Sequence, residues 1–268
     1  MSKIENAVEM ARNKRHATQQ ESQGQVPPEM PRLADQDPAY AQTKVISLDK
    51  SHLEKHRLMM LIDDPKAVDC YNLLCTQLLQ KTRDKGHNSI MVTSALKGEG
   101  KTITAINLAV SIAREVKQTV LLVDTDLRNP AIHHYLGCDG QKGLRDYLLA
   151  DEPLAELLIN PGLAKMVVLA AGKRLSGSTE ILGSPKMEKL VEEMKRRYPE
   201  RYVIFDCPPL LTAPDALIFS SYVDGVIFVV EAGRTPRDEI TKAIELLDGK
   251  NIIGLVMNGV RETRRAYY

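Results

Sequence analysis

Ser94-Ala95-Leu96-Lys97-Gly98-Glu99-Gly100-Lys101-Thr102 is the stretch that decides the fold. It follows a short apolar run of β-forming residues, 89–93, and precedes a helix-forming run, 103–114. A strand, a glycine-rich turn and a helix in this order direct backbone N–H groups and the positive end of the helix dipole at a phosphate group. Lys101 can reach the β- and γ-phosphates of a nucleotide, and the Thr102 hydroxyl can hold Mg²⁺. The spacing fits G-x-x-x-x-G-K-[ST] with Ala95 in place of the first glycine, and it therefore predicts a nucleotide-binding loop.

The composition is that of a globular protein without a strong overall charge. The 268 residues are 43% hydrophobic and 26% charged, which suits one large domain with or without a tail. A formal net charge of +1 supplies no field that would attract nucleic acid or lipid. No apolar run reaches the roughly 18 residues that span a bilayer, and the N-terminus lacks the apolar core of a signal peptide. We therefore expect a cytoplasmic protein with no membrane span of its own, which reaches the membrane only through a partner.

The cysteines and the paired histidines predict no zinc site. His133 and His134 have no cysteine or acidic partner at ligand spacing, so we expect them to be surface residues. No C-x-x-C pair is present, and we expect reduced thiols at all four cysteines, Cys70, Cys75, Cys138 and Cys207.

Residues 1–43 differ in composition from the rest of the chain. Apolar residues recur at helical spacing within 2–15, which predicts a short amphipathic helix. Such a helix is marginal alone, so it either docks on a partner or on its own domain, or it frays. Residues 18–42 are rich in Gln, Pro, Asp and Ser, and this composition predicts a disordered linker. We expect one domain over 44–262 and a short tyrosine-bearing tail over 263–268.

Strands and helices alternate along the predicted domain. Asp64 and Pro65 have the pattern of a helix N-cap followed by Pro at the first helical position. The expected helices are 67–81, 103–114, 143–150, 153–159, 185–198, 213–220 and 236–247. The expected strands are 89–93, 119–124, 166–170, 201–205, 225–230 and 252–257. This alternation predicts an α/β fold with a mostly parallel sheet covered by helices on both faces.

Carboxylates end two of the apolar strand-forming runs. Asp124 follows the run 119–123, and Asp206 follows the run 201–205. Ligands of open α/β sheets lie outside the carboxyl ends of the strands, so we expect both aspartates near Thr102. Because Mg²⁺ prefers oxygen ligands, these three residues form a candidate metal site. The alternative is that the two aspartates cap neighbouring helices or pair with the lysine of the loop.

Three segments together resemble the bacterial tyrosine kinases of capsule and exopolysaccharide export. They are Ala-Leu-Lys-Gly-Glu-Gly-Lys-Thr at 95–102, Leu-Leu-Val-Asp-Thr-Asp-Leu-Arg-Asn-Pro at 121–130 and Val-Ile-Phe-Asp-Cys-Pro-Pro at 203–209. They match the family's Walker A, its Walker A′ ending in D-x-D-x-R, and its Walker B ending in D-x-P-P. The Walker A′ ending separates this family from most other P-loop proteins. The resemblance covers about 45–260 and implies a P-loop NTPase fold and an ATP-dependent protein-tyrosine kinase that uses Mg²⁺.

The resemblance also implies roles for single residues. Asp124 would lie near the metal and the attacking hydroxyl as the candidate base, and Asp126 would support the metal shell. Arg128 would hold an incoming phosphoacceptor or contact a neighbouring subunit. Lys101 and the Walker B residue Asp206 complete the candidate catalytic set. Phosphoryl transfer depends mainly on positioning and on neutralisation of negative charge, which these residue types can supply.

Nucleotide contacts are implied for the glycine-rich loop and for one residue far along the chain. Asn258 resembles the residue that touches adenine in related ATPases. The remaining candidates are consecutive: Lys97, Gly98, Glu99, Gly100, Lys101, Thr102 and Ile103.

Acceptors and partners are likewise implied by the resemblance. Kinases of this family phosphorylate tyrosines of their own C-terminal tail in trans between subunits, and this chain ends in Tyr267 and Tyr268. The alternative is a chance pair, since the chain holds nine tyrosines. The family also implies self-association and a membrane polysaccharide co-polymerase whose cytoplasmic tail activates the kinase.

One family feature is absent from the expected helix ahead of the loop. The family's E-x-x-R-x-x-R, which joins subunits into a ring, corresponds to Asp69, Asn72 and Cys75, so both arginines are missing. Neither replacement can supply a planar bidentate guanidinium. A weaker or different assembly, or an ATPase with little kinase activity, therefore stays open.

Two other functions remain as alternatives. Min- and Par-type positioning ATPases carry an extra lysine early in the loop, where this chain has Leu96 and then Lys97. They also lack the D-x-D-x-R ending. A nucleotide-binding scaffold without transfer activity is the second alternative.

Overall fold

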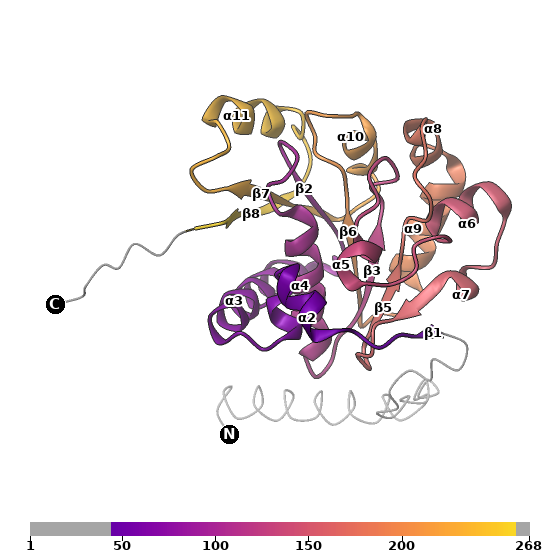
Figure 1. The fold of residues 1–268 in the computed structure, drawn as a ribbon. Helices are drawn as coiled ribbons and strands as arrows, with labels where there is room; N and C mark the ends of the chain where they lie inside the picture. The colour runs from indigo at the N-terminus through magenta and orange to yellow at the C-terminus, as the bar shows by residue number, and fades with distance from the viewer. Residues whose placement is uncertain (1–43, 261–268) are drawn as a thin grey trace, which may run out of the picture. The chain divides into compact units, whose positions relative to one another are not determined.

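The computed structural model describes residues 44–260, which contain one eight-stranded sheet (Figure 1). The strand order is β1-β4-β5-β3-β6-β2-β7-β8, and every pair is parallel except β4 with β5. The strands are β1 Lys44–Val45, β2 Ser89–Ser94, β3 Thr119–Asp124, β4 Leu158–Asn160, β5 Met166–Leu169, β6 Arg201–Asp206, β7 Gly225–Glu231 and β8 Ile252–Asn258. The expected N-terminal helix and linker, and the tail tyrosines Tyr267 and Tyr268, lie outside the described residues.

Helices cover both faces of the sheet, as the alternating pattern predicts. They are α2 Lys50–Lys55, α3 Pro65–Thr82, α4 Lys101–Arg114, α5 Ile132–Leu136, α6 Leu144–Ala150, α7 Leu154–Leu157, α8 Ser178–Leu182, α9 Pro185–Arg196, α10 Asp215–Phe219 and α11 Arg237–Glu245. Two short 3₁₀ helices, Met59–Leu61 and Arg83–Lys85, flank α3. None of the helices within 44–260 has the length and hydropathy that a membrane span requires.

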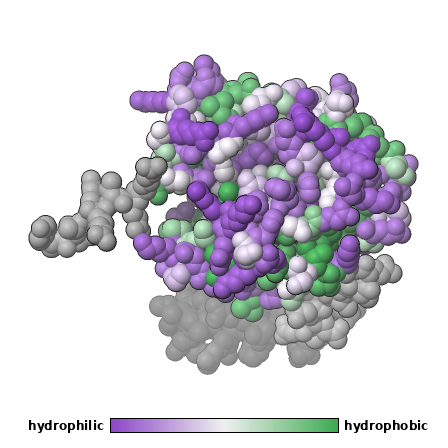
Figure 2. Space-filling model, in the orientation of Figure 1, coloured by the Kyte–Doolittle hydropathy of each residue, from purple (hydrophilic) through white to green (hydrophobic). Residues whose placement is uncertain are grey.

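Alternating strand residues build two hydrophobic layers. Ile90 and Val92 of β2 pack with α3 and α4, whereas Met91 between them packs in the layer that contains α9. All residues of β2 and β3 are buried, because helices lie on both sides of these central strands. The outer face shown in Figure 2 is mainly hydrophilic, with apolar residues scattered in small groups.

The N-cap of α3 confirms a local prediction. The Asp64 carboxylate accepts a hydrogen bond of 3.0 Å from the Ala67 N–H, and Pro65 occupies the first helical position. The cap satisfies one backbone donor that the helix start leaves open, while Pro lacks the donor altogether. The helix therefore begins where the sequence indicates.

The expected helix over 153–159 is wrong at its C-terminal end. α7 ends at Leu157, and the next three residues form β4, which pairs with both β1 and β5. The long-range ladder supplies backbone partners that a helix period cannot reveal. β1, α2, α5 and α8 were not predicted, because segments this short carry too few periodic positions.

Candidate active site

The loop between β2 and α4 is shaped by two glycines in the left-handed region. Gly98 has φ +85° and Gly100 has φ +90°, and side chains other than glycine rarely adopt such angles. A Cβ atom added to Gly100 would lie 1.9 Å from Asn258 Nδ2. That amide donates a 3.0 Å hydrogen bond to the Glu99 carbonyl. The C-terminal end of β8 therefore supports the loop through Asn258. The adenine contact predicted for Asn258 stays a prediction.

Glu99 supports the loop with its side chain. Its carboxylate accepts a 2.7 Å hydrogen bond from the Leu96 N–H and another from the Thr235 hydroxyl. Only 3% of the residue is exposed. The Glu99 side chain therefore connects the loop to the segment between β7 and α11. Because the side chain is engaged there, only the backbone of Glu99 is available to contact a nucleotide. Nothing in the sequence pattern pointed to Thr235.

Lys101 lies between two carboxylates at the carboxyl ends of neighbouring strands. Its Nζ is 3.2 Å from Asp126 Oδ2 and 3.3 Å from Asp206 Oδ1. The Thr102 hydroxyl donates a 2.6 Å hydrogen bond to the other oxygen of Asp206. The α/β topology thus brings together four of the predicted site residues from three different strand ends.

Burial and neighbouring opposite charges shift the pKa values of the groups in this cluster in opposite directions. Burial disfavours the charged form of Lys101, yet Asp206, Asp126 and Asp124 raise its pKa above the ordinary lysine value. Burial raises the pKa of Asp206, although Lys101 and the Thr102 hydroxyl favour its ionised form. The cluster therefore favours a charged lysine against carboxylates that lack solvent. Phosphate oxygens that entered here would meet this ammonium group directly.

Asp124 is fully buried beside Asp206 and is bonded to the backbone of the following loop. Its carboxylate accepts from the N–H groups of Asp126, Ala131 and Ile132, at 3.1, 2.9 and 3.0 Å. Burial and the neighbouring Asp206 raise its pKa. Asp124 therefore organises the Walker A′ loop and the start of α5, as the capping interpretation predicted. Its role as a base or metal ligand stays a prediction.

Arg128 is held in place by a carboxylate that the sequence pattern missed. Its guanidinium donates two hydrogen bonds of 3.1 Å to Asp215, one to each oxygen, and a third to Thr179. Asp215 also accepts from the hydroxyls of Ser178 and Thr179. Asp215 resembles an ordinary first-turn acid of α10, so only the fold reveals this bidentate pair. Arg128 is thus held in a fixed orientation.

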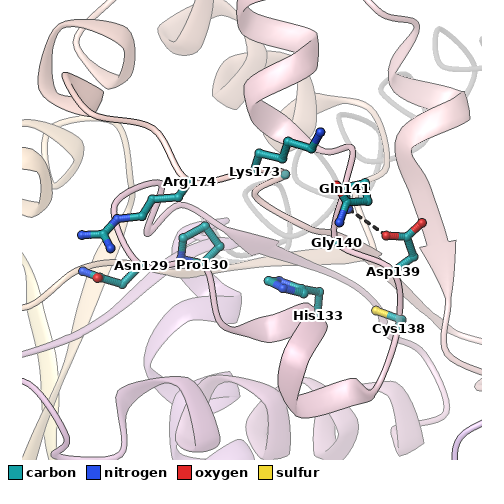
Figure 3. A pocket seen from close by; sticks show the side chains of 10 residues that line it. Asn129, Pro130, His133, Cys138, Asp139, Gly140, Gln141, Lys173 and Arg174 are labelled. Atoms are coloured by element: carbon teal, nitrogen blue, oxygen red, sulfur yellow. Dashed lines mark hydrogen bonds between the residues drawn. The ribbon is translucent and has the colours of Figure 1, made fainter.

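Two adjoining hollows lie beside these loops. The smaller, about 260 Å³, is lined by Lys97, Arg128, Pro208, Thr212 and Arg174, among others, so all three motif loops border it. The larger, about 570 Å³, shares Arg174 and Asn129 with it and also contacts Lys173 and His133 (Figure 3). His133 is thus half-buried against a hollow, whereas His134 is exposed as expected. Sequence reasoning did not identify Lys173 or Arg174.

The oxygen-donor set fits a magnesium ion better than a caged transition metal. No three His, Cys, Asp or Glu side chains converge as a metal cage within 44–260. Mg²⁺ is commonly held by one or two carboxylates together with substrate phosphates, and it needs no such cage. Thr102 and Asp206, joined by their hydrogen bond, present hard oxygens of the required kind. All four cysteines are free, as predicted.

Comparisons with known proteins agree with this geometry. A family model described as an AAA domain matches residues 88–245. The tyrosine-protein kinase YwqD of Bacillus subtilis is 32% identical over 216 residues, which make up 79% of this chain and 90% of that protein. The tyrosine-protein kinase CpsD of Streptococcus agalactiae is 30% identical over 205 residues, or 75% of this chain and 87% of that protein.

A solved structure supports the same conclusion. The kinase domain of the Escherichia coli tyrosine kinase ETK matches with a TM-score of 0.69 at 28% identity. The match covers 75% of this chain and 78% of that domain. The predicted fold class and the resemblance based on the three motifs are both confirmed.

Proposed function

The chain belongs to the bacterial tyrosine kinase family, and on this premise we propose that it transfers the γ-phosphoryl group of ATP to protein tyrosine in exopolysaccharide or capsule synthesis and export. The observation that supports this most strongly is the position of Lys101 in a glycine-shaped loop, against Asp126 and Asp206. Residues 44–262 would carry this chemistry.

Binding of ATP would use the loop and its helix. The N–H groups of the loop and of the first turn of α4 would donate hydrogen bonds to phosphate oxygens, and Lys101 would exchange its present carboxylate contacts for the β- and γ-phosphates. Thr102, Asp206 and Asp124 would hold Mg²⁺, which would supply charge neutralisation on the phosphates. Asn258 would lie beside the adenine.

Transfer itself would require positioning of the acceptor hydroxyl. The phenolic oxygen forms a bond to the γ-phosphorus, the bond from that phosphorus to ADP breaks, and the phenolic proton passes to a carboxylate, for which Asp124 is the candidate. Asp126 would keep Lys101 oriented. Arg128, fixed by Asp215, would face the incoming acceptor.

The proposed setting is the cytoplasmic side of the membrane. A membrane polysaccharide co-polymerase would recruit and activate the chain through its cytoplasmic tail, and copies of the chain would associate with one another. Tyr267 and Tyr268 are the candidate acceptors within the chain. The family membership supports each of these points.

Phosphotyrosine formation tests the proposal. The purified chain is incubated with Mg-ATP, with and without the cytoplasmic tail of a candidate activator, and phosphotyrosine is mapped by mass spectrometry. We expect phosphotyrosine that disappears in Lys101→Met, because the substitution removes the cation that contacts the transferred group. ATP hydrolysis without any phosphotyrosine would instead favour a nucleotide-switched ATPase of the Min and Par kind.

A further inference from the structure

We propose that the two hollows form one basic trough that selects acceptor tyrosines flanked by acidic residues of another protein, in preference to the chain's own tail. The trough is defined by Lys97, Lys173 and Arg174 on its walls. This inference rests on the proposed function and specifies its substrate class.

The trough borders the loops that carry the candidate active site. The P-loop, the Walker A′ loop and the Walker B loop all border the smaller hollow, through Lys97, Arg128 and Pro208. A 2.9 Å hydrogen bond from the Leu175 N–H to the Leu127 carbonyl fixes the loop that carries Arg174 against the Walker A′ loop. A polypeptide that presents a tyrosine to the site from this side would therefore pass Arg174.

The trough carries positive charge that the described part of the chain does not neutralise. Lys97, Lys173 and Arg174 are exposed, and none of them has a carboxylate partner within residues 44–260. Arg128, in contrast, is paired with Asp215. The acidic lining residue Asp139 belongs to the larger hollow and accepts a hydrogen bond from the Gln141 N–H.

Arg174 occupies the junction of the two hollows. It lines both, and Figure 3 shows it beside Asn129 with its guanidinium pointing away from His133. A free guanidinium binds a carboxylate through two parallel hydrogen bonds, which makes it selective for Asp and Glu side chains. Lys173 and Arg174 lie outside the P-loop, and the triphosphate has its own cation in Lys101, so the charge of these two residues is available to a different ligand.

The chain's own tail has the wrong charge for this trough. Residues 261–268 contain Arg261, Arg264 and Arg265 against one acid, Glu262. Like charges that approach one another are disfavoured, and such contacts suppress wrong partners. An acidic segment of a second protein is therefore the better acceptor.

The test uses two synthetic peptides that differ only in the residues around one tyrosine, acidic in the first and basic in the second. For the unaltered chain we expect kcat/KM to favour the acidic peptide about ten-fold, the ratio that 1.4 kcal/mol produces. Arg174→Glu should remove this preference mainly through KM for the acidic peptide and should improve transfer to the basic one. The KM for ATP distinguishes nucleotide binding from peptide docking, and it should change less than about two-fold, because Arg174 lies on a different loop from the one that binds phosphate.

Lys117→Glu is the matched control, because it makes the same charge reversal just before β3, at the amino ends of the strands. It should leave the peptide preference intact. Equal rates for the two peptides, or a rise in KM for ATP alone in Arg174→Glu, would overturn the inference.

A second measurement does not depend on transfer. The fluorescently labelled acidic peptide with Phe in place of its tyrosine should bind the unaltered chain, and binding should weaken about ten-fold in Arg174→Glu and at high salt. Absence of phosphotyrosine with retained selective binding would reject the proposed function and keep the acidic docking site. Transfer to tyrosine without any preference for the acidic peptide would keep the proposed function and reject the acidic docking site.

Discussion

Asp124 combines a structural and a proposed chemical role in one buried carboxylate. The Asp124 carboxylate accepts three backbone hydrogen bonds. The substitution Asp124→Asn keeps the shape of the side chain and one acceptor oxygen, but it removes the charge. We expect tyrosine phosphorylation to fall about 100-fold or more, the range that loss of a general base produces, with nucleotide affinity largely retained. The measurements are the initial rate of phosphotyrosine formation and titration with a fluorescent ATP analogue.

Asp248→Asn serves as the control, since Asp248 is an exposed carboxylate in the turn after α11. A thermal unfolding curve for each variant separates loss of the α5 cap from loss of the base. Transfer at close to the original rate in Asp124→Asn would mean that another group takes the proton.

Gly100 shows how a single missing side chain permits the loop. In Gly100→Ala the new methyl group would meet the Asn258 amide, and the residue would still have to adopt φ +90°. We expect nucleotide affinity to drop roughly ten-fold, or 1.4 kcal/mol, because the loop must move away from β8. The affinity for a fluorescent ATP analogue is the readout.

Gly233→Ala separates the two causes of that loss. Gly233 also has a positive φ, of +72°, yet a Cβ atom there would meet nothing within 4 Å. We expect Gly233→Ala to lower the free energy of unfolding by about 1 kcal/mol through backbone strain alone and to leave the affinity for the ATP analogue unchanged. Equal losses of affinity in both variants would show that the Asn258 contact is unimportant.

At the scale of elements, Asp224 joins the beginnings of β2 and β7 to α9. It is 2.6 Å from Lys195 Nζ and accepts from the N–H groups of Asn88 and Ser89. Burial raises its pKa, but these donors prevail and hold the pKa below its ordinary value. The folded state therefore binds fewer protons than the unfolded state in acid, and the stabilisation from Asp224 is present above about pH 4 and lost as the pH falls through the lowered value.

Urea unfolding of the unaltered chain and Asp224→Asn checks this pH dependence. At pH 7 we expect the substitution to lower the free energy of unfolding by about 2–3 kcal/mol, typical of hydrogen bonds to a charged group. At pH 3 the difference should shrink, because the unaltered carboxyl is then approaching protonation. A difference that is the same at both pH values would contradict this assignment.

Helix α3 explains why the two missing arginines cannot both simply be restored. The position of the second arginine is Cys75, which is fully buried, and burial raises the pKa of its thiol to about 11. The position of the first is Asn72, whose side-chain oxygen accepts a hydrogen bond from Ser111 of α4. Cys75 therefore contributes to packing within this domain, and an arginine there would bury an unpaired charge. Asn72 is exposed and links α3 to α4 only through its hydrogen bond.

At the scale of the whole molecule, the charge of the trough predicts how fast one copy of the chain phosphorylates the C-terminal tail of another copy. A chain with Lys101→Met and an intact tail is mixed with an active chain that carries Tyr267→Phe and Tyr268→Phe. Label on the first chain then reports transfer between molecules. We expect slow labelling by this active chain and several-fold faster labelling when it also carries Arg174→Glu, since charge reversal would attract the basic tail. Phosphate incorporation per minute is the measurement, and slower labelling with Arg174→Glu would refute the charge argument.

The sequence by itself determined the central layout of this protein. Apolar runs that end in Asp124 and Asp206 predict buried parallel strands, and strands of that kind deliver their carboxyl ends to one edge. The loop from 94 to 102 has a local pattern that specifies its own turn and helix start. These features depend on neighbours in the sequence, so they could be predicted without coordinates. The structure brings Lys101 and Thr102 of that loop within hydrogen-bonding distance of Asp206.

Only the tertiary structure decided which distant groups complete the site. Asp215 meets Arg128 from 87 positions away, Asn258 meets the loop from 159, and Thr235 meets Glu99 from 136. The antiparallel β4 and the hollow that Arg174 and Lys97 both line arise in the same way. No local periodicity encodes such pairs, because the crossovers between strands set which loops meet. Residue patterns therefore predict where a phosphate would bind, whereas the folded chain shows which charges an acceptor would encounter.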